Sequence, residues 1–291
     1  MGKQDKQNKN RKQGQFALVM KRMLQNKSAV IGMSIIACMA VIAILSPWIM
    51  PYKYDAPDVL SAFSGPSKAH WFGTDDLGRD IFSRIIYGAR YSLSLGLLAC
   101  GFSAIVGVIF GSIAGYFGGK TDMIIMRIMD VLGAIPSTLL AVCIAATLGT
   151  GYVNCIFALG VSGVPAFARL MRASLLNVSN LEYVEAAKSI NCSNPRIILK
   201  YAIPNALAPV IVQTTMGIAH SLISAAALSY IGLGIQLPTP EWGAMLSGGR
   251  NYIRDYPHLV LAPGIAIMIT VLSMNLIGDA LRDAMDPKLK K

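Results

Sequence analysis

The chain has 291 residues, of which 54% are hydrophobic and 14% are charged. Soluble domains usually carry about 25% charged residues, so this composition argues against a soluble protein and indicates a membrane protein. The net charge of +11 raises the question of nucleic acid binding, but eight basic residues precede the first apolar run. A basic segment beside a membrane span sets orientation and contacts anionic lipid, so we expect no nucleic acid partner.

The apolar runs predict an all-α integral membrane protein, a bundle of six transmembrane helices. Each run reaches the roughly 20 residues that a helix needs to cross a bilayer, where helices satisfy every backbone polar group. Residues 1–28 form a basic N-terminal tail, and the run after it is long enough to be retained as a first helix. The six runs are 29–50, 91–116, 124–148, 152–175, 206–230 and 259–281.

The distribution of lysine and arginine predicts how the helices are oriented. If the N-terminus is cytoplasmic, the inner segments hold 19 of these residues and the outer segments hold 7. This split follows the positive-inside rule. We therefore expect both termini on the cytoplasmic side of the membrane.

Two long connections are expected on the outer side. Residues 29–90 would hold the first span and an outer loop, and apolar residues from Ile81 to Ile86 recur there at helical spacing. This pattern predicts an interfacial amphipathic helix before the five-helix core of residues 91–291. The second connection, 231–257, is rich in glycine and proline, and we expect that it dips back into protein but not into lipid.

The stretch from Ala114 to Thr121, "AGYFGGKT", resembles a phosphate-binding loop with alanine in place of the first glycine. Such a loop follows a strand and opens a helix of an α/β domain, but this stretch lies between two expected spans. We interpret it as a short cytoplasmic turn with Lys120 on the positive side. Nucleophile elbows, HExxH motifs and metal-ligand spacings are absent from the sequence, so we expect neither catalysis nor a metal site.

Polar residues inside the expected spans have two interpretations. Intramembrane polar side chains either bond neighbouring helices or line an aqueous path, and the sequence leaves both open. The residues concerned are Gln213, Thr214, Thr215, His220 and Asn275. Two charged pairs at helical spacing, Arg127 with Asp130 and Asp279 with Arg282, are expected to be ion pairs at helix ends.

The segment 181–204, "LEYVEAAKSINCSNPRIILKYAIP", is a polar interruption between two spans. Glu182 and Glu185 are expected on one helix face, and the small Ala186 and Ala187 let another surface approach closely. Asn191 tolerates the left-handed conformation that ends helices, and Pro195 suits the first turn of a second helix. The pattern predicts two short helices with a break, either a docking element or a simple loop.

At this segment the chain resembles the permease subunits of bacterial ABC importers. "EAA" followed by "IP" is similar to the EAA loop of that family, although Asn191 stands where the family has glycine and Ile203 where leucine commonly precedes the proline. The stretches "FGTDDLGRD", "IIYGARYSLSLG", "GYFGG", "MDVLGAIPS" and "EWGAML" are similar to the second permease of the dipeptide, oligopeptide and nickel group. The likeness covers about residues 20–288.

The resemblance implies a type I importer permease in the cytoplasmic membrane of a bacterial cell. It would work with a second permease, two ATPase subunits and an extracytoplasmic binding protein. The EAA loop, about 181–204, would couple the permease to the ATPases. Its residues in this chain are Glu182, Glu185, Ala186, Ala187, Asn191, Ile203 and Pro204. ATP and magnesium would bind to the partner subunits, so this chain is expected to be a transport subunit without a cofactor of its own.

Other readings differ in cargo or mechanism. The same family includes nickel-chelate permeases, and the sequence does not choose between peptide and chelate. A secondary carrier or channel would need ionisable groups at membrane depth or a filter motif, of which the chain has few. The path residues expected in any of these cases are Gln213, Thr214, His220 and Asn275.

Overall fold

A computed structural model describes residues 15–285, and these are helical apart from loops and an isolated bridge between Thr74 and Asp80. The longer helices are α2 (Gln15–Gln25), α3 (Lys27–Ile49), α4 (Ile81–Phe117), α5 (Gly119–Gly133), α6 (Ser137–Leu148), α7 (Tyr152–Ser179), α8 (Glu182–Ser189), α11 (Ala208–Tyr230), α12 (Trp242–Gly249) and α13 (His258–Met285). The shorter turns are η1 (Val59–Ser61), α9 (Asn194–Arg196), a π-helical turn η2 (Ile197–Ala202), α10 (Ile203–Ala206) and η3 (Arg250–Tyr252).

Five helices are long and apolar enough to cross a membrane: α3, α4, α7, α11 and α13. The third expected span, 124–148, is not one straight helix, because α5 and α6 meet at an angle of 83°. The break falls at Pro136, whose ring disfavours helical geometry in the residue before it. With this bent pair counted as one span, the six expected spans are present in the all-helical fold.

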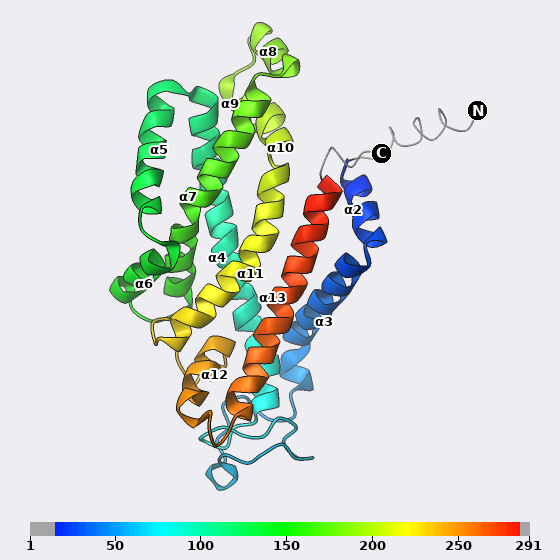
Figure 1. The fold of residues 1–291 in the computed structure, drawn as a ribbon, viewed down its shortest axis with the longest axis vertical. Coiled ribbons are helices and arrows are strands. Elements are labelled where there is room, and N and C mark those ends of the chain that lie inside the picture. The colour runs from blue at the N-terminus through cyan, green and yellow to red at the C-terminus, as the bar shows by residue number, and fades with distance from the viewer. Residues whose placement is uncertain (1–14, 286–291) are drawn as a thin grey trace, which may run out of the picture.

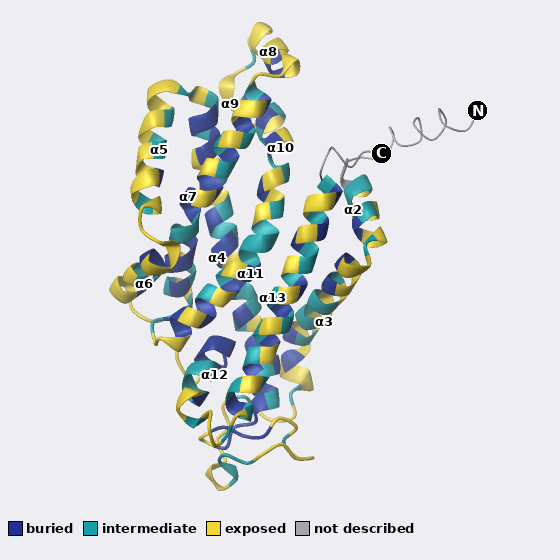
Figure 2. Ribbon diagram, in the orientation of Figure 1, coloured by how far each residue is buried: buried dark blue, intermediate teal, exposed yellow. Residues whose placement is uncertain are grey.

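The α4 and α7 helices form the centre of the bundle (Figures 1 and 2). They approach closely because three glycines one turn apart, Gly107, Gly111 and Gly115, face α7. A Cβ atom added at Gly111 would lie 2.4 Å from the Ala168 carbonyl oxygen. Around this centre, α11 packs on α4, α7 and α13, and α3 packs on α4 and α13.

Part of the expected N-terminal tail is structured. Residues 15–25 form α2, which packs on α13 through the buried Met23. The Arg22 guanidinium donates to the Ala284 carbonyl at 3.1 Å, near the end of α13. The remainder of the expected tail, residues 1–14, lies outside the described residues, as do Lys288, Lys290 and Lys291.

The expected interfacial helix, built on the apolar residues from Ile81 to Ile86, is not a separate element. These residues are the first turns of α4, which runs unbroken for 37 residues. Ile81 and Arg84 are each 1% exposed, and Ile81 packs in one apolar cluster with Trp242 and Met245 of α12. The Arg84 guanidinium donates to the Tyr54 carbonyl at 2.9 Å and lies 3.6 Å from the Asp75 carboxylate, so its charge is compensated inside the protein.

The connection 231–257 folds back into protein as expected, with α12 packed on α4, α11 and α13. Trp242 is buried, and its indole N–H donates to the Ile85 carbonyl at 3.1 Å. The buried Glu241 carboxylate accepts the Gly243 and Ala244 N–H groups, each at 2.8 Å, and so caps α12. Burial raises the pKa of Glu241, although these N–H donors oppose that effect.

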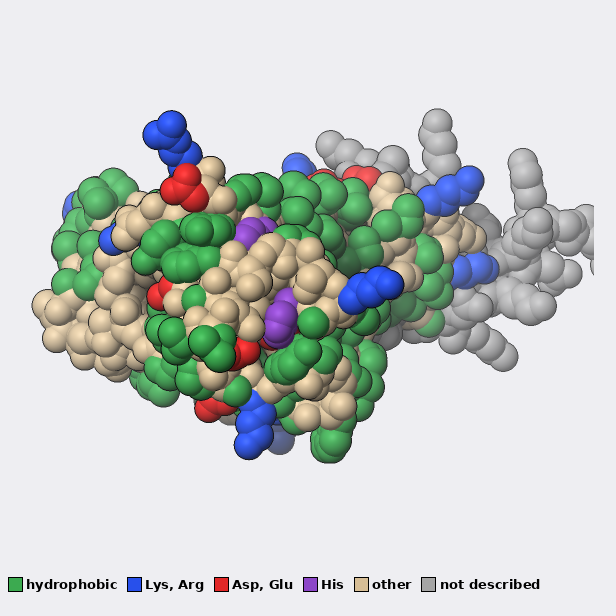
Figure 3. All heavy atoms as spheres, turned by 90° about the horizontal axis from the view of Figure 1, so that it is seen from below, with side chains coloured by type: hydrophobic (Ala, Val, Ile, Leu, Met, Phe, Trp, Pro, Cys, Tyr) green, Lys and Arg blue, Asp and Glu red, His purple; other side chains and the backbone are tan. Residues whose placement is uncertain are grey.

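The molecule has two distinct ends (Figure 1). The α8 helix, α2 and the end of α13 lie at one end, while α12 and the 50–80 loop lie at the other. Seen from the α12 end, hydrophobic side chains gather between scattered single charges (Figure 3). The placement of α2, α8 and the end of α13 agrees with the same-side arrangement predicted from the positive charges.

Candidate functional site

The 181–204 segment projects from one end of the bundle as α8 and the turns that follow it (Figure 1). The side chains of Glu182, Glu185 and Ala186 are exposed, and α8 is exposed over much of its surface (Figure 2). Among the described residues, neither glutamate lies within ion-pair distance of a cation. The outer face of α8 therefore presents two uncompensated carboxylates beside a small residue.

The other face of α8 is anchored in the bundle. Val184 and Ala187 are buried in one apolar cluster with Met171 and Leu175 of α7. The small Ala187, expected to admit a partner surface, instead admits this chain's own helices, whereas Ala186 remains exposed. Because α8 and α7 share one packed core, a displacement of α8 would be transmitted to α7.

Asn191 ends α8 as the sequence predicted. Its φ angle is 56°, in the left-handed region. The Cys192 N–H donates to the Ala187 carbonyl at 3.1 Å, and the Asn191 N–H donates to the Lys188 carbonyl at 2.9 Å. These two bonds form a Schellman motif with Asn191 at the left-handed position that glycine usually occupies.

The rest of the segment returns to the membrane through α9, η2 and α10. Pro195 lies in the first turn of α9, and the Tyr116 hydroxyl of α4 donates to the Asn194 side-chain oxygen at 2.9 Å. Ile203 is half-buried and packs against the cluster that holds α8, whereas Pro204 is exposed. The Lys188 ammonium lies 5.8 Å from the Tyr116 ring centre, a second link to α4.

A cavity of about 580 Å³ lies among α4, α6, α7 and α11. Of the four expected path residues, Gln213 and His220 of α11 line it. Thr214 and Asn275 do not: the Thr214 hydroxyl donates to the Val210 carbonyl at 2.8 Å, and Asn275 is an exposed residue of α13. Gln213 and His220 thus lie where a path could pass, whereas the Thr214 hydroxyl bonds the backbone of its own helix and neither lines the cavity nor links two helices.

Several lining residues were missed from the sequence. They are hydroxyl-bearing side chains, namely Ser103, Ser137, Thr138, Ser162, Ser221 and Ser224. On α11, Gly217, His220, Ser221 and Ser224 recur at helical spacing and so share one face, which was a usable signal for the two serines. The described lining carries no aspartate, glutamate, lysine or arginine, so it is a polar wall with little fixed charge.

The ion pairs near the α8 end differ in part from expectation. Asp130 pairs with Arg169 of α7 at 3.3 Å rather than with Arg127 of its own helix. Asp122 and Arg172 form a two-point pair with both distances at 2.5 Å, which ties α5 to α7. The 114–121 stretch contains the end of α4 and the start of α5, which turn into one another at Gly118 and Gly119, both at positive φ, and Lys120 is exposed.

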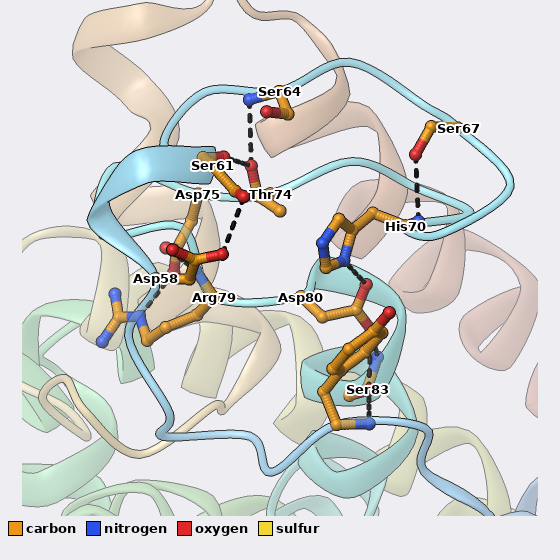
Figure 4. Close-up of polar contacts among 11 residues, drawn as sticks. Asp58, Ser61, Ser64, Ser67, His70, Thr74, Asp75, Arg79, Asp80 and Ser83 are labelled. Carbon is orange, nitrogen blue, oxygen red and sulfur yellow. Dashed lines mark hydrogen bonds and ion pairs between the residues drawn. The ribbon is translucent and has the colours of Figure 1, made fainter.

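At the opposite end, buried ionic contacts fix the 50–80 loop (Figure 4). The Arg79 guanidinium lies 2.7 Å from the Asp75 carboxylate, and His70 lies 2.9 Å from Asp80. Asp80 also accepts the Ser83 N–H at 2.7 Å and caps α4. Across residues 15–285, no group of three or more histidine, cysteine, aspartate or glutamate residues has the geometry of a metal site.

Comparison with known proteins identifies the family. The family model of the binding-protein-dependent transport system inner membrane component matches residues 107–291, and that of the N-terminal transmembrane domain of oligopeptide transport permease C matches residues 14–66. The dipeptide transport system permease protein DppC of Alkalihalophilus pseudofirmus is 47% identical over 270 residues, covering 93% of this chain and 89% of that protein. The glutathione transport system permease protein GsiD of Pectobacterium atrosepticum is 43% identical over 273 residues, which cover 93% of this chain and 90% of that protein.

Solved structures agree on the fold. The inward-facing MetNI methionine ABC transporter superposes with a TM-score of 0.56 at 17% identity, over 69% of this chain and 96% of that chain. An amino acid ABC transporter crystallised with histidines superposes with a TM-score of 0.51 at 14% identity, over 68% of this chain and 92% of that chain. From the two family models and the 47% identical relative, this chain belongs to the ABC importer permeases of the dipeptide and oligopeptide family.

Proposed function

We propose that this permease subunit carries dipeptides or short oligopeptides into the cytoplasm, in an importer driven by ATP. The observation that carries the proposal is the similarity over 93% of the chain to permeases named for dipeptide and glutathione transport. The lining of the 580 Å³ cavity suits this cargo, because hydroxyl and amide groups can bond a peptide backbone of any sequence. Because the lining has little fixed charge, it does not favour peptides whose side chains carry one particular charge.

The 181–204 segment is the contact with an ATPase subunit. Support comes from its isolated position, its uncompensated Glu182 and Glu185, and the apolar Ile190, which is 74% exposed at the tip. When ATP brings the ATPase subunits together, α8 moves with them and carries α7 and α11 through their shared core. The cavity then changes the side to which it opens.

The remaining parts of the importer follow from this assignment. The α8 end faces the cytoplasm, and the α12 end receives cargo from an extracytoplasmic binding protein. A second, homologous permease completes the path, and two ATPase subunits bind ATP and magnesium. The helical turn at 114–121 supports placing ATP in the partners, since it lacks the preceding strand of a phosphate-binding loop.

Uptake by the assembled importer in proteoliposomes tests the cargo. We expect ATP-dependent uptake of a labelled dipeptide, with no competition from a nickel chelate. Replacing Ser224, which lines the cavity, by tryptophan should abolish most of the uptake, because the indole fills the path. The matched Ile223→Trp variant changes the neighbouring, exposed residue and should transport normally.

Uptake of the nickel chelate alone would replace the peptide assignment by the nickel alternative. Equal uptake by the Ser224→Trp and Ile223→Trp variants would show that cargo does not pass through this cavity. The two results are separable, because the first concerns the cargo and the second the route.

A further inference from the structure

A second pocket, of about 420 Å³, lies on the outside of the bundle near the α12 end. Its lining consists of Tyr87, Arg90, Tyr91 and Ser94 of α4 and Tyr152 of α7. Neither the cargo cavity nor the 181–204 segment includes any of these residues. The pocket also differs from the cavity in its chemistry, because its lining holds one positively charged side chain together with three tyrosines and a serine.

The aromatic wall is continuous. Tyr54 stacks on Tyr87 with ring centres 4.2 Å apart, Tyr87 lies 6.0 Å from Tyr91, and Tyr91 lies 6.1 Å from Tyr152. The Tyr152 hydroxyl donates to the Ser94 hydroxyl at 2.7 Å and so joins α7 to α4. Several tyrosine hydroxyls and one serine hydroxyl thus surround the same small space.

The wall is held in place from inside. Arg84, which is almost wholly buried, donates to the Tyr54 carbonyl at 2.9 Å and fixes the loop residue whose ring stacks on Tyr87. The pocket is therefore a built feature of α4 and the 50–80 loop.

Arg90 gives the pocket its charge. Its guanidinium lies 5.5 Å from the Tyr87 ring centre, and no carboxylate of residues 15–285 lies within ion-pair distance of it. The side chain is exposed, so the ring orients the guanidinium without neutralising it. The hydroxyls and the guanidinium together favour an anionic, oxygen-rich group such as a phosphate.

The face of α4 that lines the pocket becomes apolar about two turns deeper in the bundle. Leu97 and Leu98 follow Arg90 and Tyr91 by seven residues each, which places each leucine below its partner, and both are exposed. On α7, Phe157 is also exposed, and its ring centre lies 5.3 Å from that of Phe102, which follows Leu98 by one turn of α4. A free anion would not need this surface, whereas an acyl chain would cover it.

The length of α4 indicates the depth of the pocket relative to the bilayer. A helix of 37 residues is about 55 Å long, and the hydrocarbon core of a bilayer is about 30 Å thick. The first turns of α4 therefore extend beyond the hydrocarbon. Residues 87–94 fall at the level of the headgroups, where tyrosine and arginine are enriched.

From this juxtaposition we infer that the pocket binds the headgroup of a negatively charged phospholipid, with Arg90 on the phosphate and the acyl chains along Leu97, Leu98 and Phe157. The bound lipid fills the gap between α4 and α7 at the α12 end. It thereby stabilises the crossing of these two helices, the centre of the bundle.

The test measures lipid binding to the importer complex purified from its native membranes and then delipidated. Phosphatidylglycerol and phosphatidylcholine of the same acyl chains are titrated separately, and bound lipid is counted by native mass spectrometry. We expect saturable binding of phosphatidylglycerol, about fivefold weaker in the Arg90→Gln variant, which corresponds to the loss of one basic contact with anionic lipid. Tyr152→Phe, a smaller change, should also weaken binding.

Arg250→Gln is the matched control. Arg250 is also exposed at the α12 end, and its guanidinium also lies over a tyrosine ring, at 5.8 Å from the centre of Tyr230, but it lines neither pocket. This variant should bind phosphatidylglycerol as the wild type does. Equal weakening by both substitutions, or equal binding of both lipids by the wild type, would overturn the inference.

A partner protein on this face is the competing occupant. In that case Arg90→Gln would lower the amount of second permease that co-purifies, and phosphatidylglycerol binding would be unchanged. That outcome would also overturn the inference. Neither result depends on cargo, so the lipid site stands or falls separately from the peptide assignment.

Discussion

Asn191 shows how one residue shapes the end of the 181–204 segment. Its left-handed φ of 56° allows the two hydrogen bonds that close α8, so the chain reverses immediately after the helix. Asparagine adopts this conformation at lower cost than most residues with a side chain, and glycine adopts it at none. This property made the position predictable from sequence, because a helix-ending residue acts within a single turn.

Substitution of Asn191 should follow this conformational preference. Asn191→Gly should leave stability and uptake unchanged, whereas Asn191→Val should cost about 1–2 kcal/mol because a β-branched residue resists positive φ. The measurement is the thermal unfolding of the purified complex together with uptake. A valine variant as stable as the glycine variant would contradict the assigned backbone geometry.

Glu185 carries the electrostatic part of the proposed contact. It is exposed on the outer face of α8 and has no cation within ion-pair distance among the described residues, so its charge is available to a partner. The Glu185→Lys variant should reduce uptake by roughly tenfold or more, since like charges across an interface cost several kcal/mol. Insertion and stability should be unaffected, because the side chain is exposed.

The control for Glu185 is Asp255→Lys, a charge reversal at an exposed position at the α12 end. The quantity compared is the number of ATP molecules hydrolysed per molecule of cargo transported. Asp255→Lys should leave this number unchanged, whereas Glu185→Lys should raise it. Normal coupling in the Glu185→Lys variant would remove this residue from the contact.

At the scale of elements, the α4–α7 crossing holds the bundle together. Gly107, Gly111 and Gly115 repeat the small-xxx-small spacing that lets transmembrane helices approach closely. The spacing is present in the sequence and marks a surface where another helix can approach. The identity of the partner helix could not be read from it, because the spacing marks only one of the two surfaces.

Gly111→Val should disrupt this crossing, because the new Cβ would lie 2.4 Å from the Ala168 carbonyl oxygen. Overpacking of this kind costs about 1–3 kcal/mol, so we expect a lower unfolding temperature and poor assembly. Gly101→Val is the control on the same helix, since no atom lies within 4 Å of a Cβ added there. Equal loss in both variants would indicate a general intolerance of α4 to valine.

The bounds of α4 and the bend of α5–α6 mark the limits of local reasoning. Hydropathy located the part of α4 that crosses lipid, but the first turns hold Arg84, whose burial depends on Tyr54 and Asp75 thirty and nine residues away. From the sequence, Arg84 was expected at the surface, because the partners that compensate its charge are distant along the chain. The bend at Pro136 had a local signal, whereas its angle depends on packing against α7.

For the whole molecule, the six spans followed from composition, because the bilayer requires an apolar helix of similar length for every span. Their orientation stays a prediction from the positive charges. The cavity did not follow, since its lining comes from four helices whose relative rotations are set by tertiary packing. Gln213 and His220 were found because long polar side chains are conspicuous in a span. The serines were not, since a serine in a helix often bonds its own backbone.

The central claim is that the α8 end of this chain meets an ATPase subunit. Photo-crosslinking in native membranes tests it directly, with p-benzoylphenylalanine in place of Ile190 at the tip of α8, or in place of the exposed Ile253 near α12. We predict a crosslink to an ATPase subunit from position 190 and none from position 253. A product from position 253 alone, or no ATPase product from position 190, would contradict the account.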